Sequence, residues 1–177
     1  NRSDPCILAL DAAIGSETTS MLADTFAAVI VSRHPTRSDT TAIRYCGIWQ
    51  AEVGKYLDFE PIEAELYRLC NDYSIIEVPY DITQLHDMMQ RMRKSGINTK
   101  VFSQQQARLV ADKDLQADII ARRIAHDGNP LLRQHIDNAD IKKSSEGIRI
   151  VKRSQSLKVD AAVSLSMARA RLNYYNL

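Results

Sequence analysis

The stretch PCILALDAAIGS, residues 5–16, begins as a buried strand and delivers a carboxylate at its end. Its apolar run from Ile7 to Leu10 is typical of a strand in the middle of a sheet. Asp11 follows this run directly. An unpaired buried carboxylate is costly, so Asp11 either has a partner that neutralises it or lies where solvent and a cation can reach it. The other acids of the chain help to distinguish these alternatives.

The chain has 177 residues, of which 45% are hydrophobic. We therefore expect a single domain, residues 1–177, that buries roughly 70% of its unfolded surface. There is no apolar run near 18 residues and no charged-then-apolar leader, so we expect a soluble intracellular protein with no membrane contact. Three widely separated cysteines without a C-x-x-C pair argue against a disulfide framework and a cysteine zinc site. The first residue is Asn rather than Met, which suggests a fragment of a longer protein.

The charge of the chain is unevenly distributed. The net charge is +1, but residues 141–177 contain eight basic and two acidic residues, a net charge of +6, so the first 140 residues carry −5. A basic C-terminal third beside an acidic remainder suggests one face for a polyanion and another for metal or solvent. A solvated surface with chance clustering would give the same count.

Apolar runs and helical spacing predict strands that alternate with helices. Strands are expected over residues 6–12, 24–33, 40–54, 74–81 and 98–104. Helices are expected over 58–73, 82–96, 105–128 and 154–175, and a hairpin could pair 131–143 with 147–153. The helix over 105–128 has apolar positions at Leu109, Leu115, Ile119, Ile120 and Ile124. Short connections make the first strands antiparallel, so the order favours an α/β fold with a mixed sheet, antiparallel strands first and parallel strands after, flanked by helices.

Three aspartates lie at the ends of predicted elements, two at strand ends and one near a helix start. Asp11 and Asp81 each end an apolar strand, and they would emerge side by side if those strands are parallel neighbours. Asp160 lies near the start of the last helix and can point toward the same edge. Three convergent carboxylates repel one another unless a divalent cation holds them, and oxygen ligands favour Mg²⁺ or Mn²⁺ over zinc. Each acid also has a structural reading: a turn or hydrogen-bonded carboxylate for the first two, and a first-turn helix acid for the third.

The order and spacing of these segments resemble the nuclease domain of tailed-bacteriophage large terminase subunits, which has the RNase H-like fold. LALDAAIGS followed by ADTFAAVIV looks like the opening hairpin of that family, and IIEVPYD is similar to its strand with the second acid. HDGNPLLRQHIDNADIKK, then RIVKR and KVDAAVSLSMARAR, looks like its C-terminal signature. The resemblance covers most of the chain.

The resemblance implies a metal-dependent endonuclease that cuts concatemeric double-stranded viral DNA during packaging. Asp11, Asp81 and Asp160 would be both catalytic residues and metal ligands for two Mg²⁺ or Mn²⁺ ions roughly 3.5–4 Å apart, with Asp11 as the bridge. It also implies an ATPase domain, a small terminase subunit and a portal protein as partners, in the cytoplasm of the host cell. This chain has no G-x-x-x-x-G-K-[ST] loop, so we expect that the ATPase domain is absent from it.

Other polar residues have candidate roles around these acids. Asp24 could support the site, or it could cap a loop, and Lys158 could touch a scissile phosphate or simply be solvated. His126 and His135 show no metal-ligand spacing and are expected to be structural or close to DNA. A basic segment is expected to contact DNA phosphates without reading sequence. Its residues are Lys142, Lys143, Arg149, Lys152 and Arg153.

Two other functions remain open from the sequence. A Holliday-junction resolvase-like nuclease on the same fold would use a similar carboxylate cluster, but would be expected to dimerise and to prefer branched DNA. A non-catalytic DNA-binding module would keep the basic segment while its acids served structure only. A panel of linear, supercoiled and four-way DNA distinguishes the first alternative, and a metal titration distinguishes the second.

Overall fold

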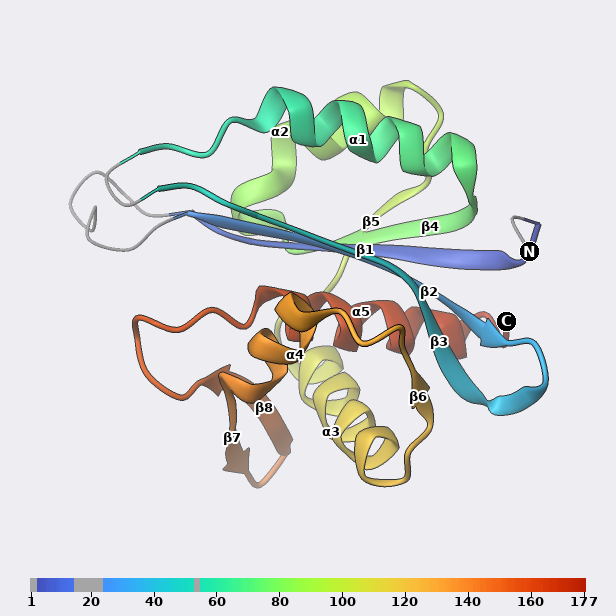
Figure 1. Ribbon diagram of the computed structural model, residues 1–177, viewed down its shortest axis with the longest axis vertical. Helices are drawn as coiled ribbons and strands as arrows, with labels where there is room; N and C mark the ends of the chain where they lie inside the picture. Colours follow the sequence, from blue (N-terminus) through green and yellow to red (C-terminus); the bar gives the residue numbers. More distant parts are fainter. Residues whose placement is uncertain (1–2, 15–23, 53–54) are drawn as a thin grey trace.

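The computed structural model describes residues 3–14, 24–52 and 55–177, and these form strands and helices in alternation (Figure 1). The strands are β1 (Pro5–Ala13), β2 (Thr25–His34), β3 (Arg37–Gln50), β4 (Ser74–Tyr80), β5 (Thr99–Val101), β6 (Ile124–Ala125), β7 (Ala139–Ser144) and β8 (Gly147–Lys152). The helices are α1 (Phe59–Asp72), α2 (Ile82–Lys94), α3 (Gln106–Ile120), α4 (Pro130–Asp137) and α5 (Asp160–Tyr174).

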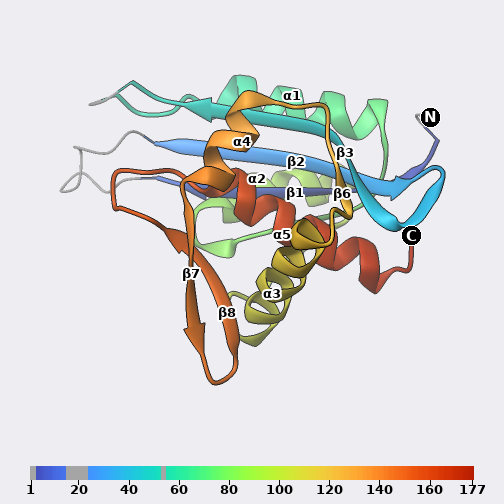
Figure 2. The same cartoon turned by 60° about the horizontal axis from the view of Figure 1, so that its bottom comes forward.

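A six-stranded mixed sheet in the order β5-β4-β1-β2-β3-β6 runs through the centre of the molecule. The first three strands form an antiparallel meander, whereas β4, β5 and β6 each lie parallel to their neighbours β1, β4 and β3. The predicted mixed sheet with antiparallel strands first is therefore confirmed. Strands β7 and β8 form a separate antiparallel ribbon, which projects away from the sheet in Figure 2.

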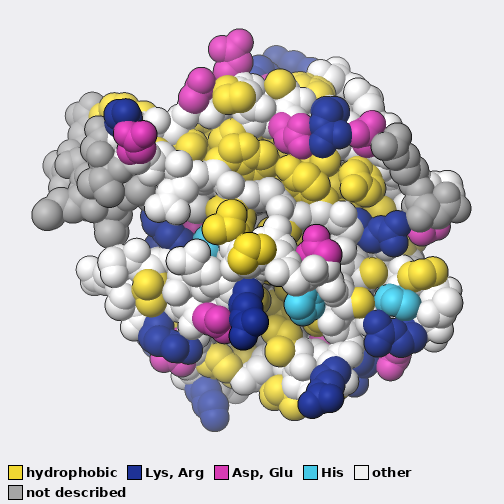
Figure 3. Space-filling view, viewed as in Figure 1, with side chains coloured by type: hydrophobic (Ala, Val, Ile, Leu, Met, Phe, Trp, Pro, Cys, Tyr) yellow, Lys and Arg dark blue, Asp and Glu magenta, His cyan; other side chains and the backbone are white. Residues whose placement is uncertain are grey.

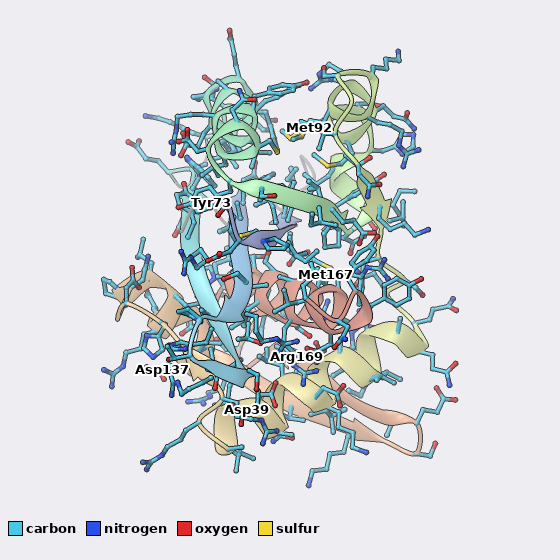
Figure 4. The ribbon with its side chains drawn as sticks, turned by 90° about the vertical axis from the view of Figure 1, so that its right-hand side faces the viewer. Asp39, Tyr73, Met92, Asp137, Met167 and Arg169 are labelled. Carbon is cyan, nitrogen blue, oxygen red and sulfur yellow. The ribbon has the colours of Figure 1, made fainter. Side chains whose placement is uncertain are left out.

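Each face of the sheet has its own hydrophobic core, because successive residues of a strand point to opposite sides. Leu8 of β1 packs in the core that α1 and α2 cover, whereas the preceding residue, Ile7, packs in the core with α3, α4 and α5. Figure 4 shows the two layers from the side, with Met92 in the first core and Met167 in the second. The sheet is therefore buried on both faces, which explains the continuous apolar runs of β1 and β2.

The helix predicted over residues 105–128 is too long, since α3 ends at Ile120. Arg122 has a φ of 57°, in the left-handed region that ends helices, and the next N–H, of Arg123, donates to the carbonyl oxygen of Asp118 at 2.8 Å. The chain then adds β6 to the sheet, with Ile124 paired to Thr41 of β3. This long-range pairing overrides the local preference for helix.

The hairpin predicted from residues 131–143 is partly wrong, because the first half of that segment is α4. Asn129 caps this helix: its Oδ1 accepts from the N–H groups of Leu131 at 2.9 Å and Leu132 at 3.1 Å. Pro130 occupies the first turn, where the missing N–H is not needed. The second half, β7, does pair with β8 as predicted.

The buried face of α3 contains charged as well as apolar side chains, which differs from the prediction of an apolar face. Leu115 is buried as expected, but Ile119 and Ile120 are 43% and 74% exposed. Arg108 and Asp112 are buried in their place. The face of α3 that packs inward therefore contains charged side chains, and these need hydrogen-bond partners from other elements.

The last helix begins later than predicted, at Asp160 rather than near residue 154. Helix α5 then packs against β1 and β2 across the lower face of the sheet in Figure 1. Within the part of the chain that the structure describes, no helix has the length and apolar character that a membrane span requires.

Candidate active site

Two of the predicted acids lie at matching points of neighbouring strands: Asp11 lies within β1, near its end, and Asp81 directly follows β4. Strands β1 and β4 are parallel neighbours, with Leu10 paired to Tyr80, so Asp11 and Asp81 are the next residues along each strand. The carboxyl ends of parallel neighbours meet at one edge of a sheet. Both acids therefore lie at the same end of the sheet, the left-hand end in Figure 1.

Asp11 is half-buried, on the side of the sheet that α3 and α5 cover. Burial raises the pKa of its carboxyl well above the usual value, and the negative charges of Asp160 and Asp81 add to this rise. The positive charges of Arg108 and Lys152 act in the opposite direction. An acid in such an environment is a candidate functional group, because a bound cation would favour its ionised form.

Asp81 begins α2 as its N-cap residue. Its Oδ1 accepts hydrogen bonds from the backbone N–H of Thr83 at 3.0 Å and from the Thr83 hydroxyl at 2.9 Å. This cap satisfies an N–H group at the start of the helix and fixes the rotamer of the aspartate. The structural role that the sequence left open is therefore present, and it uses one of the two carboxylate oxygens.

Asp160 is the first residue of α5 and is only 3% exposed. Its Oδ2 atom is buried and has no hydrogen-bond partner among the residues that the structure describes. Burial raises the pKa of this carboxyl, while the charges of Lys152 and Lys158 lower it. A buried carboxylate oxygen without a partner is costly in free energy. Of the three acids, Asp160 therefore gives the strongest structural support for cation binding.

The three acids supply only oxygen donors, which is the ligand type that Mg²⁺ and Mn²⁺ prefer. Asp160 fits a cation because its buried Oδ2 has no hydrogen-bond partner in the part of the chain that the structure describes. However, within residues 3–14, 24–52 and 55–177 no three His, Cys, Asp or Glu side chains are grouped closely enough to hold a metal ion. Carboxylates without a counter-ion repel one another, so the convergence of the three acids on an ion would require their side chains to move.

Of the two predicted supporting residues, Lys158 lies within electrostatic reach of Asp160, and Asp24 lies within reach of Lys158. Lys158 is half-buried, and burial lowers the pKa of its ammonium group. The positive charge of Lys152 lowers this pKa further, whereas the negative charges of Asp160 and Asp24 raise it. Asp24 is 5% exposed, and its Oδ2 accepts from the N–H of Leu57 at 3.4 Å. Asp24 thus supports the segment after β3, which agrees with the loop-capping alternative, and it lies close enough to influence the lysine.

The basic segment occupies the β7–β8 ribbon and the residue after it. Lys142 and Lys143 are exposed toward its turn, and Figure 3 shows Lys and Arg side chains at the lower left, where the ribbon lies. Lys152 ends β8 at the base of the ribbon, where it acts on the acids. The two arginines of the segment each make a hydrogen bond within the protein. Arg149 donates to the carbonyl oxygen of Gln104 at 2.8 Å, and Arg153 donates to the carbonyl oxygen of Ala139 at 3.3 Å.

Sequence reasoning missed a buried polar network beside Asp11. Arg108 donates through Nε to Oδ1 of Asp112 at 2.7 Å. Asp112 also accepts from the Ser166 hydroxyl of α5 at 2.5 Å and from the N–H of Ile150 of β8 at 2.8 Å. The network therefore ties α3, α5 and the ribbon together. The i,i+4 spacing of arginine and aspartate was the only sequence signal for it.

His135 is buried and structural, one of the two roles that the sequence suggested. Its Nδ1 accepts a hydrogen bond from the N–H of Ala161 at 3.1 Å, next to Asp160. Burial, together with the charge of Lys158, lowers the pKa of this histidine to about 4. His126 is exposed, and its Nδ1 accepts from the N–H of Gly128 at 3.0 Å, in the turn before α4.

Comparison with protein families gives one extensive match. The model of a family described as "Terminase large subunit, endonuclease domain" matches residues 7–174, nearly the whole chain. A search of curated protein sequences finds no match.

Solved structures with a similar fold come from viral terminases. The large terminase of bacteriophage HK97 has a TM-score of 0.78 at 14% identity, and the match covers 97% of this chain and 40% of that one. The large terminase nuclease of the thermophilic phage G20c, with bound magnesium, has a TM-score of 0.63 at 15% identity, with 96% and 85% covered. The human cytomegalovirus terminase nuclease domain, soaked with Mn, has a TM-score of 0.55 at 10% identity, with 98% and 85% covered. These similarities confirm the predicted RNase H-like fold.

Proposed function

This chain belongs to the family of terminase large-subunit endonuclease domains, and from that premise we propose that it is a divalent-metal-dependent endodeoxyribonuclease. Its substrate would be concatemeric double-stranded viral DNA, cut by two-metal-ion hydrolysis of the phosphodiester bond. The observation that carries the proposal is the buried Oδ2 of Asp160, which has no partner among the described residues and belongs to an acid whose charge acts on Asp11, at the sheet end that Asp81 shares.

Asp11, Asp81 and Asp160 are the proposed catalytic residues and metal ligands. Asp11 is the acid whose pKa both of the others raise, which supports its assignment as the bridge between two Mg²⁺ or Mn²⁺ ions. When bound, such ions activate the attacking water and stabilise the leaving 3′ oxygen of an in-line displacement.

Contacts and burial around the three acids would orient the carboxylates and strengthen the electrostatic interactions in the site. The cap that Asp81 makes on α2 holds its second carboxylate oxygen in a fixed direction. The burial of Asp160 keeps bulk water away, which strengthens electrostatic interactions in the site. Burial raises the pKa of Asp160, Lys152 and Lys158 oppose that rise, and the two lysines would also attract the phosphate of a DNA backbone.

The β7–β8 ribbon is the proposed DNA contact. Lys142 and Lys143 are exposed toward its turn, and Lys152 lies at its base near the acids, so a backbone could follow the ribbon into the site. Arg149 and Arg153 would add charge to the same surface. Phosphate contacts carry no sequence code, which suits a nuclease with little sequence preference.

The whole protein would be longer than this chain, which spans 40% of the HK97 large terminase that it matches. We propose that residues 1–177 are its single nuclease domain, that an ATPase motor domain precedes it, and that a small terminase subunit and a portal protein are its partners. The place of action would be the cytoplasm of the infected host cell.

Cleavage of supercoiled plasmid tests the proposal. The wild-type chain is incubated with Mn²⁺, Mg²⁺ or EDTA, beside Asp11→Asn and the matched control Asp39→Asn, which changes an exposed aspartate near the start of β3. We expect metal-dependent nicking by the wild type and by the control, and none by Asp11→Asn. Equal cutting by Asp11→Asn would refute the assignment of this acid. A preference for four-way DNA over plasmid would favour the resolvase alternative.

A further inference from the structure

Helix α5 begins in the protein interior without a capping side chain of its own. Its N-cap residue is Val159, whose apolar side chain cannot accept a hydrogen bond. The first N–H groups of any helix lack partners within the helix, and a buried helix start needs acceptors from elsewhere. Asp160, the first residue of this helix, depends on that start for its position.

The end of α4 supplies the missing contacts. His135 accepts through Nδ1 from the N–H of Ala161 at 3.1 Å, and Asn138 donates through Nδ2 to the carbonyl oxygen of Lys158 at 3.0 Å. The carbonyl oxygen of Asn138 in turn accepts from the N–H of Arg153 at 2.9 Å. Figures 1 and 2 both show α4 against the first part of α5.

These two bonds bracket Asp160, since one holds the carbonyl two residues before it and the other holds the N–H one residue after it. His135 is 4% exposed, so no water replaces its ring readily. Its Nδ1 accepts a hydrogen bond and therefore carries no proton, which leaves the proton of the neutral ring on Nε2. The backbone on both sides of Asp160 is thus held by α4, while its buried Oδ2 has no hydrogen-bond partner among the described residues.

We propose that His135 and Asn138 form a clamp that positions Asp160 for metal binding. This inference rests on the proposed function and adds two positioning residues that lie outside the three acids. Without the clamp, the first turn of α5 would fray and its carboxylate would lose its fixed direction. Residues that orient a metal ligand in this way typically change metal affinity by about 10- to 100-fold when removed.

The test compares four proteins by Mn²⁺ titration in a calorimeter without DNA, and by the Mn²⁺ concentration that half-saturates plasmid nicking. His135→Leu removes the acceptor at similar volume, whereas His135→Asn offers an amide oxygen close to the place of Nδ1. Leu132→Ala is the control, because it loosens the same helix without removing either bond. Thermal melting in EDTA records the stability of each.

We expect His135→Leu to bind Mn²⁺ at least about tenfold more weakly and His135→Asn to restore most of the affinity. Leu132→Ala should melt at a lower temperature and yet bind Mn²⁺ like the wild type. If His135→Leu does not fold, Asn138→Ala replaces it, with a loss of affinity in the same direction.

Two results would overturn the clamp alone: wild-type affinity in both His135→Leu and Asn138→Ala, or an equal loss in Leu132→Ala. A wild-type protein that binds no Mn²⁺ and cuts no DNA would instead overturn the proposed function, and the role of the clamp in metal binding would fall with it.

Discussion

Asp112 is the residue whose loss should most destabilise the domain, although it is not one of the proposed metal ligands. Asp112→Ala leaves Arg108 buried, at 3% exposure, without its carboxylate. Breaking a buried ion pair in this way costs about 3–5 kcal/mol. The N–H of Ile150 and the hydroxyl of Ser166 lose their acceptor as well. We expect the free energy of unfolding to fall by about 4 kcal/mol, a large part of the stability of a domain.

Urea denaturation followed by circular dichroism measures this loss. With a slope of about 2 kcal/mol per molar urea, the midpoint should fall by about 2 M. The matched control is Asp114→Ala on the same helix, where a carboxylate with 49% side-chain exposure lies 3.1 Å from Arg169. Figure 4 shows Arg169 between α5 and α3. The loss should be less than about 1 kcal/mol, because the Asp114 carboxylate is half exposed and Arg169 keeps its bond to Asp118 at 2.6 Å.

The double variant Arg108→Met, Asp112→Leu removes both charges at once. Because replacing a buried ion pair with apolar side chains is often neutral, it should recover at least half of the lost stability. The reasoning is refuted if Asp112→Ala is as stable as Asp114→Ala, or if the double variant is no more stable than Asp112→Ala.

Three further predictions follow from the same structure. Asp160→Asn should stabilise the metal-free protein at pH 8 by about 1 kcal/mol. This advantage should shrink as the pH falls toward 5, because an acid with a raised pKa costs stability only while it is ionised. Thermal melting in EDTA measures the difference, and a variant less stable than the wild type at pH 8 would contradict the prediction. Arg171→Ala leaves Glu77 buried without its guanidinium partner and should lower the free energy of unfolding by about 3 kcal/mol. The Mn²⁺ dependence of cleavage should not change. A changed metal dependence would show that this ion pair does affect the site. Lys142→Ala with Lys143→Ala should reduce the slope of log affinity for DNA against log salt by about two, equally for unrelated sequences; an unchanged slope would exclude these lysines from the DNA contact.

The elements that position Asp11 and Asp81 were predictable because their signals are local. An uninterrupted apolar run indicates a strand buried on both faces, and the aspartate after it is visible without knowledge of the fold. The parallel pairing of β1 and β4 was only a condition in the sequence reasoning, and the structure meets it, which brings the two acids to one end of the sheet.

The start of α4 was also visible in principle, since Asn129 followed by Pro130 is a helix start. The apolar residues after it fit either a strand or a helix, and the interpretation as a hairpin ignored the cap. The end of α3 was not visible in this way, because it depends on the pairing of β6 with β3, about 80 residues earlier in the chain.

The buried polar contacts were beyond sequence reasoning for a similar physical reason. Arg108 and Asp112 on α3 look like an exposed i,i+4 pair, and only Ser166 on α5 and the backbone of β8 make their burial favourable. His135 likewise gains its role from a helix that starts 25 residues later. Long-range partners decide whether such a side chain faces solvent or the interior.

The most direct test of the central claim is a crystal of this domain soaked in Mn²⁺ and measured at a wavelength where manganese scatters anomalously. The account predicts two anomalous peaks between Asp11, Asp81 and Asp160, with Oδ2 of Asp160 within bonding distance of one of them. Peaks held by other residues, or a saturated soak in which these three carboxylates bind no manganese, would contradict it.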